Sequence, residues 1–161
     1  MRFVSQIARI LCATIVALGG ITIAATGAHA ATTTTPVATR GVRIVEIWFD
    51  SPGPDNVSNK SLNGEWVKVQ NVTNTKKKIT GWTLHDASSH RYIFPPTVLA
   101  PHATLRVHTG RGIKNPHNRF WGSTTYIWNN SGDTARLANA KAVIVGRCSY
   151  NSRFDSVRKF C

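Results

Sequence analysis

Residues 65–71, "EWVKVQN", alternate between two kinds of side chain. Val67 and Val69 fall on one side of an extended chain, whereas Lys68 and Gln70 fall on the other, because side chains of a strand have a period of two. This pattern is typical of a strand with one face in a core and one face in solvent. The stretch therefore predicts a sheet that is buried on one side.

Similar β-rich runs recur along the chain, and turn residues separate them. No segment has the apolar period of an amphipathic helix. Short strands at close spacing are typical of all-β proteins, so we predict a β-sandwich of about seven to eight strands in two packed sheets. The predicted strands are residues 42–49, 65–71, 79–85, 91–94, 104–109, 124–130, 134–139 and 142–147.

Residues 1–30 have the features of a secretory leader. Two arginines flank the start of an apolar run over residues 10–25, and residues 28–30 read Ala-His-Ala, an A-x-A cleavage site. The run is shorter than the roughly 20 apolar residues that a membrane helix needs. We expect cleavage after residue 30, a flexible Thr-rich spacer at 31–41, and a secreted protein without a membrane anchor.

Cys148 and Cys161 are the two cysteines that follow the predicted leader. An even pair of cysteines in an exported protein most simply forms a disulfide. Here the bond would close a basic C-terminal extension, residues 151–161, into a loop.

Five motifs carry a family resemblance: "VRIVEIWFDSPGPD" (42–55), "GEWVKVQNVTN" (64–74), "ITGWTLHD" (79–86), "YIFPPTVLAPHATLRVHTGRG" (92–112) and "YIWNNSGDTARLANA" (126–140). They occur in the order seen in lamin tail domains, and residues 42–150 resemble a small exported bacterial member. The resemblance implies an immunoglobulin-like β-sandwich without catalytic residues, used as an interaction or attachment module. It assigns structural roles to Trp66, Trp82, Phe94, Pro95, Trp128, Asn130, Gly132 and Asp133.

The chain departs from the family pattern in ways that add positive charge. Lys68 occupies a position that is often acidic, and Gly146 and Arg147 stand where an aspartate is common. An acidic ligand site is therefore not expected here by analogy.

Two polar stretches offer metal-ligating residue types. His85, Asp86 and His90 suit a transition metal, but this run lies where a hairpin must turn, and Asp and Ser favour turns. Residues 50–56 supply hard oxygen ligands without the spacing of a dedicated calcium loop. We interpret both stretches as turns and expect no metal or cofactor.

Motifs of common hydrolases, such as G-x-S-x-G and H-E-x-x-H, do not occur in the sequence. The rival to a binding module is a small secreted nuclease or other hydrolase. In that hypothesis Glu65 acts as the base and His108 as the acid, with arginines on the phosphate.

The full chain holds 20 Lys and Arg against seven Asp and Glu, a formal charge of +13. Such a charge favours anionic partners. The predicted basic patch is Lys76, Lys77, Lys78, Arg106, Arg111, Lys114 and Arg119, with Phe120 and Trp121 as stacking rings. The alternative is that the charges are scattered and Trp121 is a core ring. We expect a monomer that docks on a protein partner or on an anionic polymer, either nucleic acid or a polymer of the cell envelope.

Overall fold

The computed structural model describes residues 41–161. The predicted leader and residues 31–40 of the predicted spacer lie outside this range. The described chain is almost entirely β-structure, with one short helix, α1 (Asn59–Leu62), which Ser58 caps by accepting a hydrogen bond from Ser61 N. Across residues 41–161, no helix has the length and apolar character that a membrane crossing requires.

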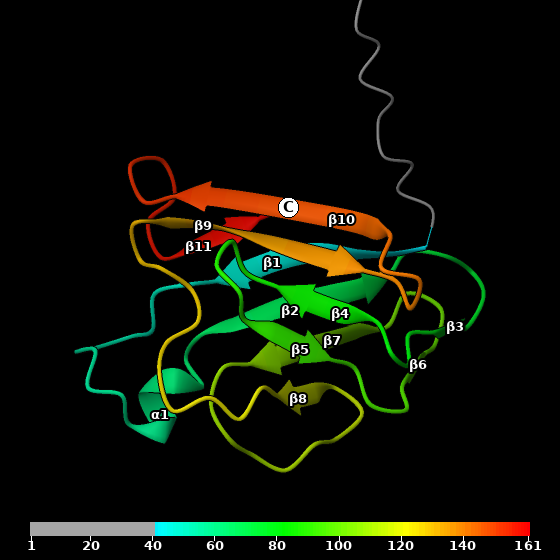
Figure 1. Cartoon of the computed structure of the whole chain (residues 1–161), viewed down its shortest axis with the longest axis horizontal. Coiled ribbons are helices and arrows are strands. Elements are labelled where there is room, and N and C mark those ends of the chain that lie inside the picture. Colours follow the sequence, from blue (N-terminus) through cyan, green and yellow to red (C-terminus); the bar gives the residue numbers. More distant parts are fainter. Residues whose placement is uncertain (1–40) are drawn as a thin grey trace, which may run out of the picture. The chain divides into compact units, whose positions relative to one another are not determined.

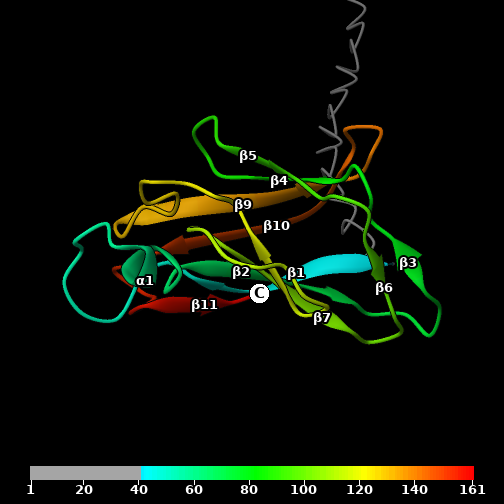
Figure 2. The same cartoon turned by 90° about the horizontal axis from the view of Figure 1, so that it is seen from below.

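The strands form two main sheets and a small ribbon (Figure 1). They are β1 (Val42–Trp48), β2 (Trp66–Asn71), β3 (Lys77–Lys78), β4 (Thr83–His85), β5 (Arg91–Ile93), β6 (Val98–Leu99), β7 (Thr104–His108), β8 (Asn118–Phe120), β9 (Gly132–Ala138), β10 (Ile144–Asn151) and β11 (Arg158–Phe160). One sheet has the order β11-β1-β2-β7-β8 and the other β10-β9-β4-β5, while β3 pairs with β6. Figure 2 shows the two main sheets as stacked layers. The predicted β-sandwich is confirmed.

The core fills the space between the two sheets, as the alternation in β2 predicts. Val67 and Val69 are fully buried, and Leu84 and Leu137 meet them from the opposite sheet with no exposed surface. The largest fully buried side chain is Trp128. Trp82, to which the family resemblance assigns a structural role, is half-buried and packs against this core.

The predicted strand at residues 124–130 is wrong. This segment is a loop, yet Ile127 and Trp128 are buried within it. Ile127 N donates to a carboxylate oxygen of Glu65 and not to a neighbouring strand. The apolar residues of this segment therefore indicate burial in the core and not a strand. The loop buries them without forming a ladder of backbone hydrogen bonds.

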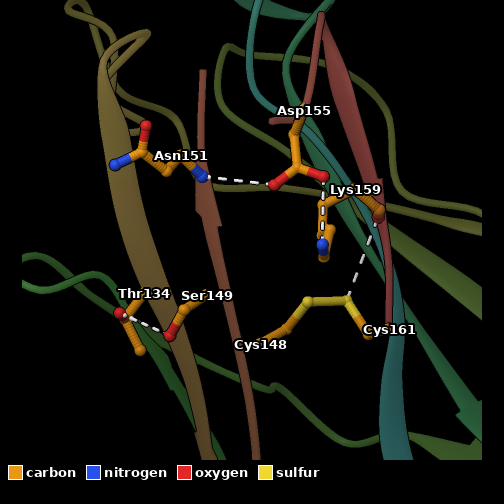
Figure 3. The surroundings of a disulfide bond; sticks show 7 residues. All are labelled: Thr134, Cys148, Ser149, Asn151, Asp155, Lys159 and Cys161. Carbon is orange, nitrogen blue, oxygen red and sulfur yellow. Dashed lines mark hydrogen bonds and ion pairs between the residues drawn. A yellow bond between two sulfur atoms is a disulfide. The ribbon is translucent and has the colours of Figure 1, made fainter. Parts of the chain in front are cut away.

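The last residues of the chain belong to the sandwich. β11 pairs antiparallel with β1, and Cys161 N donates to Val45 O. The predicted disulfide between Cys148 and Cys161 is confirmed, with a Cα–Cα distance of 5.7 Å (Figure 3). Because β10 and β11 are edge strands of different sheets, this bond joins the two sheets.

Candidate functional site

The outer side of the five-stranded sheet carries a row of aromatic and basic side chains. Trp48 pairs in register with Arg158 on one side and Trp66 on the other, and Trp66 pairs with His108. His108 in turn lies beside Phe120 of β8. Paired residues share a face of a sheet, so these five side chains form one row across five strands.

A second row on the same side is rich in cations. Lys68 pairs with Glu46 and with Arg106, and Glu46 pairs with Phe160. Arg43 follows on this side, opposite Gln70. We call this surface the cationic face and define it by Arg43, Glu46, Trp48, Trp66, Lys68, Arg106, Arg158 and Phe160. In Figure 2 the sheet that carries it is the lower layer.

Aromatic rings hold three of these cations in place. Lys68 Nζ and Arg106 Cζ lie 5.0 and 4.9 Å from the centroid of the Trp66 ring. Arg158 Cζ lies 5.2 Å from Trp48 and 4.8 Å from Phe160. A cation within about 6 Å of an aromatic centroid is attracted by the ring, so these side chains are positioned before any ligand arrives.

Glu46 is the one acidic member of the cationic face. Its carboxylate is buried and accepts a hydrogen bond from Lys68 Nζ, while Arg158 Nη1 lies 3.9 Å from its other oxygen. The carboxylate thus fixes two of the cations and exposes almost no negative charge. The net effect is a surface of positive sign.

The structure separates the residues of the predicted basic patch. Lys77 and Lys78 form β3, which pairs with β6 and not with the five-stranded sheet, and Lys76 precedes it. Arg106 lies on the cationic face. Lys114 is exposed in the connection between β7 and β8.

Hydrogen bonds hold the backbone of one arginine of that patch and the guanidinium of another. The backbone of Arg111 is bound by the side chains of Asn59 and Asn63, and its side chain is exposed. Arg119 pairs in register with the buried Val107, so it points to the opposite side of the sheet from Arg106. Its guanidinium donates to Asn118 O at 3.0 Å and lies 3.4 Å from Thr97 Oγ1.

The two rings proposed for stacking are already covered by protein. Phe120 stacks on His108 with ring centroids 5.2 Å apart, and a Cβ on Gly112 would come within 2.4 Å of the Phe120 ring, so the loop backbone lies directly against this ring. Trp121 packs against the core and meets Trp128 edge-on at 6.1 Å. Trp121 is therefore part of the core packing, which was the alternative to a stacking ring.

Comparison with protein families gives one match that spans most of the described chain. The family model described as Lamin Tail Domain matches residues 35–152. The chain belongs to the lamin tail domain family. The family has an immunoglobulin-like fold and is non-enzymatic, in agreement with the sandwich. No curated protein matches the chain.

In this lamin tail domain the W-N-N-S-G-D motif organises a loop. Asp133 accepts hydrogen bonds from Ala87 N at 2.8 Å and from Asn129 Nδ2 at 3.1 Å, which joins two turns at one end of the sandwich. Asn130 Nδ2 donates to Asp55 across that end. Gly132 has a φ of +149°, where a side chain would be strained. These contacts give the motif a structural role.

The pair Glu65 and His108, named in the nuclease hypothesis, is not assembled. Glu65 points into the core with no exposed surface, and Ile127 N donates to it at 3.3 Å. His108 lies on the outer side of the sheet, where Nδ1 donates to Asn63 O and Nε2 is 2.9 Å from Asn118 Oδ1. The two side chains face opposite sides of one sheet.

The stretch with His85, Asp86 and His90 forms a turn that Asp86 organises. The buried Asp86 carboxylate accepts from His90 N at 3.0 Å and contacts His90 Nδ1 at 2.5 Å. His85 instead contacts Thr83. Within residues 41–161, no three His, Cys, Asp or Glu side chains gather closely enough to hold a metal ion.

The sequence did contain a signal for the cationic face. Trp66 is in phase with Lys68 and not with the buried Val67, so it had to lie on the outer side. Trp48 and Arg158 gave no comparable signal, because their contact depends on the pairing of β1 with β11, which are far apart in the sequence.

Proposed function

We propose that this lamin tail domain is a non-catalytic binding module whose cationic face docks on phosphodiester polymers. These are nucleic acid or a phosphate-rich polymer of the cell envelope. The observation that carries the proposal is the set of three cations, Lys68, Arg106 and Arg158, that aromatic rings hold on one open sheet face.

Positioning by the rings lowers the entropic cost of binding. A long basic side chain loses rotamer freedom when it contacts a phosphate, at a cost of about 0.5–1.5 kcal/mol. Lys68, Arg106 and Arg158 have lost part of this freedom already through their ring contacts. Because such contacts go to phosphates and not to bases, binding is independent of nucleotide sequence and weakens with salt.

The proposed setting is outside the cell, at the envelope, with the domain acting as a monomer. The predicted leader at residues 1–30 supports export, and the disulfide is compatible with an oxidising compartment. The lysines at 76–78 remain a predicted second contribution, which acts through long-range charge.

Incubation of the full chain with labelled single-stranded DNA and with poly(glycerol phosphate) tests this function. We expect retention of both polymers at low salt, with their length unchanged after prolonged incubation. Shortening of either polymer by the pure protein would support the hydrolase instead. Failure to retain either polymer at low salt would reject the proposed function.

A matched pair of tryptophan substitutions tests whether the rings matter. Trp66→Leu removes the ring that holds Lys68 and Arg106. It should weaken polymer binding about tenfold, because ordering each freed side chain on a phosphate then costs about 0.5–1.5 kcal/mol. Trp82→Leu makes the same change at a half-buried ring outside the cationic face and should leave affinity within about twofold. Equal effects would contradict the assignment of this face.

A further inference from the structure

The outer side of the four-stranded sheet holds a second basic row that the proposed function does not use. Arg136 pairs in register with Arg147 and with His85, and His85 pairs with Arg91. The residues next to them in sequence, including Leu84, point into the core. The four basic side chains therefore cross the whole sheet on its outer side.

A row of apolar character runs beside this basic row. Two residues further along β9, Ala138 pairs with Thr83, which in turn pairs with Ile93. Ala138 also pairs with Ile144, which lies three residues from Arg147 because the register of β10 shifts between them. Residues two apart in a strand are about 7 Å apart on the same face. Ile93 and Ile144 are exposed at 51% and 36% of their surface, so apolar surface lies within one small molecule's length of the cations.

Apart from Arg147, the two rows line a hollow of about 480 Å³, which the buried Asp86 also borders. Arg91, His85 and Arg136 form its basic side, and Ile93 and Ile144 form its apolar side. Ala138 is only 4% exposed, as expected for the floor of a depression. The volume lies within the range of about 300–1,000 Å³ that small organic ligands occupy.

The positive charge in the hollow has no carboxylate partner among residues 41–161. None of the ion pairs there includes Arg91 or Arg136. Arg136 donates to the backbone oxygen of Asp86 at 2.8 Å, while the Asp86 carboxylate is engaged by His90.

The two arginines act electrostatically on the imidazole between them. Burial lowers the pKa of His85, the charges of Arg91 and Arg136 lower it further, and Asp86 opposes them. The guanidinium charges therefore reach the interior of the hollow, where an anionic group would meet them.

We infer that this hollow binds a small organic phosphomonoester, with its phosphate between Arg91 and Arg136 and its apolar body against Ile93 and Ile144. Guanidinium groups suit this head group because their planar N–H donors bind phosphate oxygens in pairs. The site lies on the opposite sheet from the cationic face and recognises a small molecule in place of a polymer.

Titration of the full chain with phenyl phosphate, followed by NMR of the His85 ring, tests the inference. We expect saturable binding that is about tenfold tighter than that of glycerol phosphate, because the phenyl ring covers exposed apolar surface. Arg91→Gln should weaken phenyl phosphate about tenfold through loss of a charged hydrogen bond. Ile93→Ser should weaken phenyl phosphate but leave glycerol phosphate unchanged.

Arg153→Gln is the matched control. It removes the same charge as Arg91→Gln, and Arg153 is exposed in the turn between β10 and β11. It should leave affinity for phenyl phosphate within about twofold. Shifts that do not saturate, equal affinities for the two phosphates, or equal effects of Arg91→Gln and Arg153→Gln would overturn the site. Polymer binding by Arg91→Gln should equal that of Arg153→Gln, which has the same charge, and this separates the site from the cationic face.

Discussion

Glu65 is a fully buried carboxylic acid that lies where β2 begins. Burial raises its pKa from 4.5 to about 8, although the backbone amides of Ile127 and Trp128 act in the opposite direction. The carboxyl is therefore protonated in the folded protein at neutral pH. In the unfolded chain it ionises near its ordinary pKa.

This difference makes folding stability depend on pH. Between pH 4.5 and about 8 the folded state holds a proton that the unfolded state has lost, so raising the pH favours unfolding. We expect a loss of about 1.4 kcal/mol per pH unit over this window. Denaturant unfolding between pH 5 and 8 measures it. Glu65→Gln, which stays neutral, should flatten the profile, and a profile that is the same in both proteins would contradict the assignment.

Asp86 and His90 differ in what they contribute to the hairpin between β4 and β5. Asp86→Ala should cost about 2–3 kcal/mol, because it leaves the backbone N–H of His90 without its charged acceptor. His90→Ala removes only a half-exposed ring and should cost about 1 kcal/mol or less. Thermal unfolding of both variants checks this order. A larger loss from His90→Ala would mean that the ring, and not the turn, holds the hairpin.

At the scale of elements, the disulfide ties the end of β11 to β10 of the other sheet. It is a three-residue edge strand that pairs with β1, and Cys161 follows it directly. Lys159 and Asp155 add an ion pair in the same loop at 3.0 Å (Figure 3). Arg158 of this strand belongs to the cationic face, so the covalent link also supports the proposed binding surface.

Removal of the disulfide should therefore affect stability and binding together. Cys148→Ala combined with Cys161→Ala should lower unfolding free energy by about 3 kcal/mol, the chain-entropy estimate for a short loop. Hydrogen exchange should show the backbone amide at position 161, which donates to Val45 O, losing protection more than those of β9. Unchanged stability in the double variant, or equal loss of protection in both strands, would show that β11 is held by its pairing alone.

Elements with a local pattern were predictable, and elements that depend on distant contacts were not. The alternation at 65–71 defines β2 because every second residue is buried. The segment at 124–130 has the composition of a strand, but it is a loop. Its apolar residues are buried because the loop packs against Glu65. β11 lacks an apolar pattern. It is a strand because it pairs with β1, and the disulfide of Cys161 follows it directly.

The basic character of the candidate site was predictable from the sequence, but the set of strands that form it was not. Arg106 belongs to the predicted basic patch and lies on the cationic face, but its partners Trp66 and Lys68 come from β2, and Arg158 comes from β11. Strand order decides which side chains become neighbours, and a single sequence does not specify that order. Arg119 shows the same limit, since the parallel pairing of β8 turns it to the opposite side from Arg106.

On the scale of the whole molecule, the two sheets present two different basic surfaces. The five-stranded sheet offers cations fixed on rings, and the four-stranded sheet offers a hollow beside exposed isoleucines. The formal charge of +13 adds a general attraction for polyanions. A charge change anywhere on the molecule alters this general attraction, so tests of the cationic face require controls with equal charge.

The most direct test is the salt dependence of DNA binding by three proteins: wild type, Arg106→Gln/Arg158→Gln, and Lys141→Gln/Arg153→Gln. The last pair removes the same charge at exposed turns outside the cationic face. Log affinity should fall linearly with log salt, by about 0.7 per phosphate contact for a single strand. We expect Arg106→Gln/Arg158→Gln to make this slope shallower by about 1.4, which corresponds to two contacts. Lys141→Gln/Arg153→Gln should keep the wild-type slope. Equal slopes in all three proteins would contradict the claim that the cationic face holds the polymer.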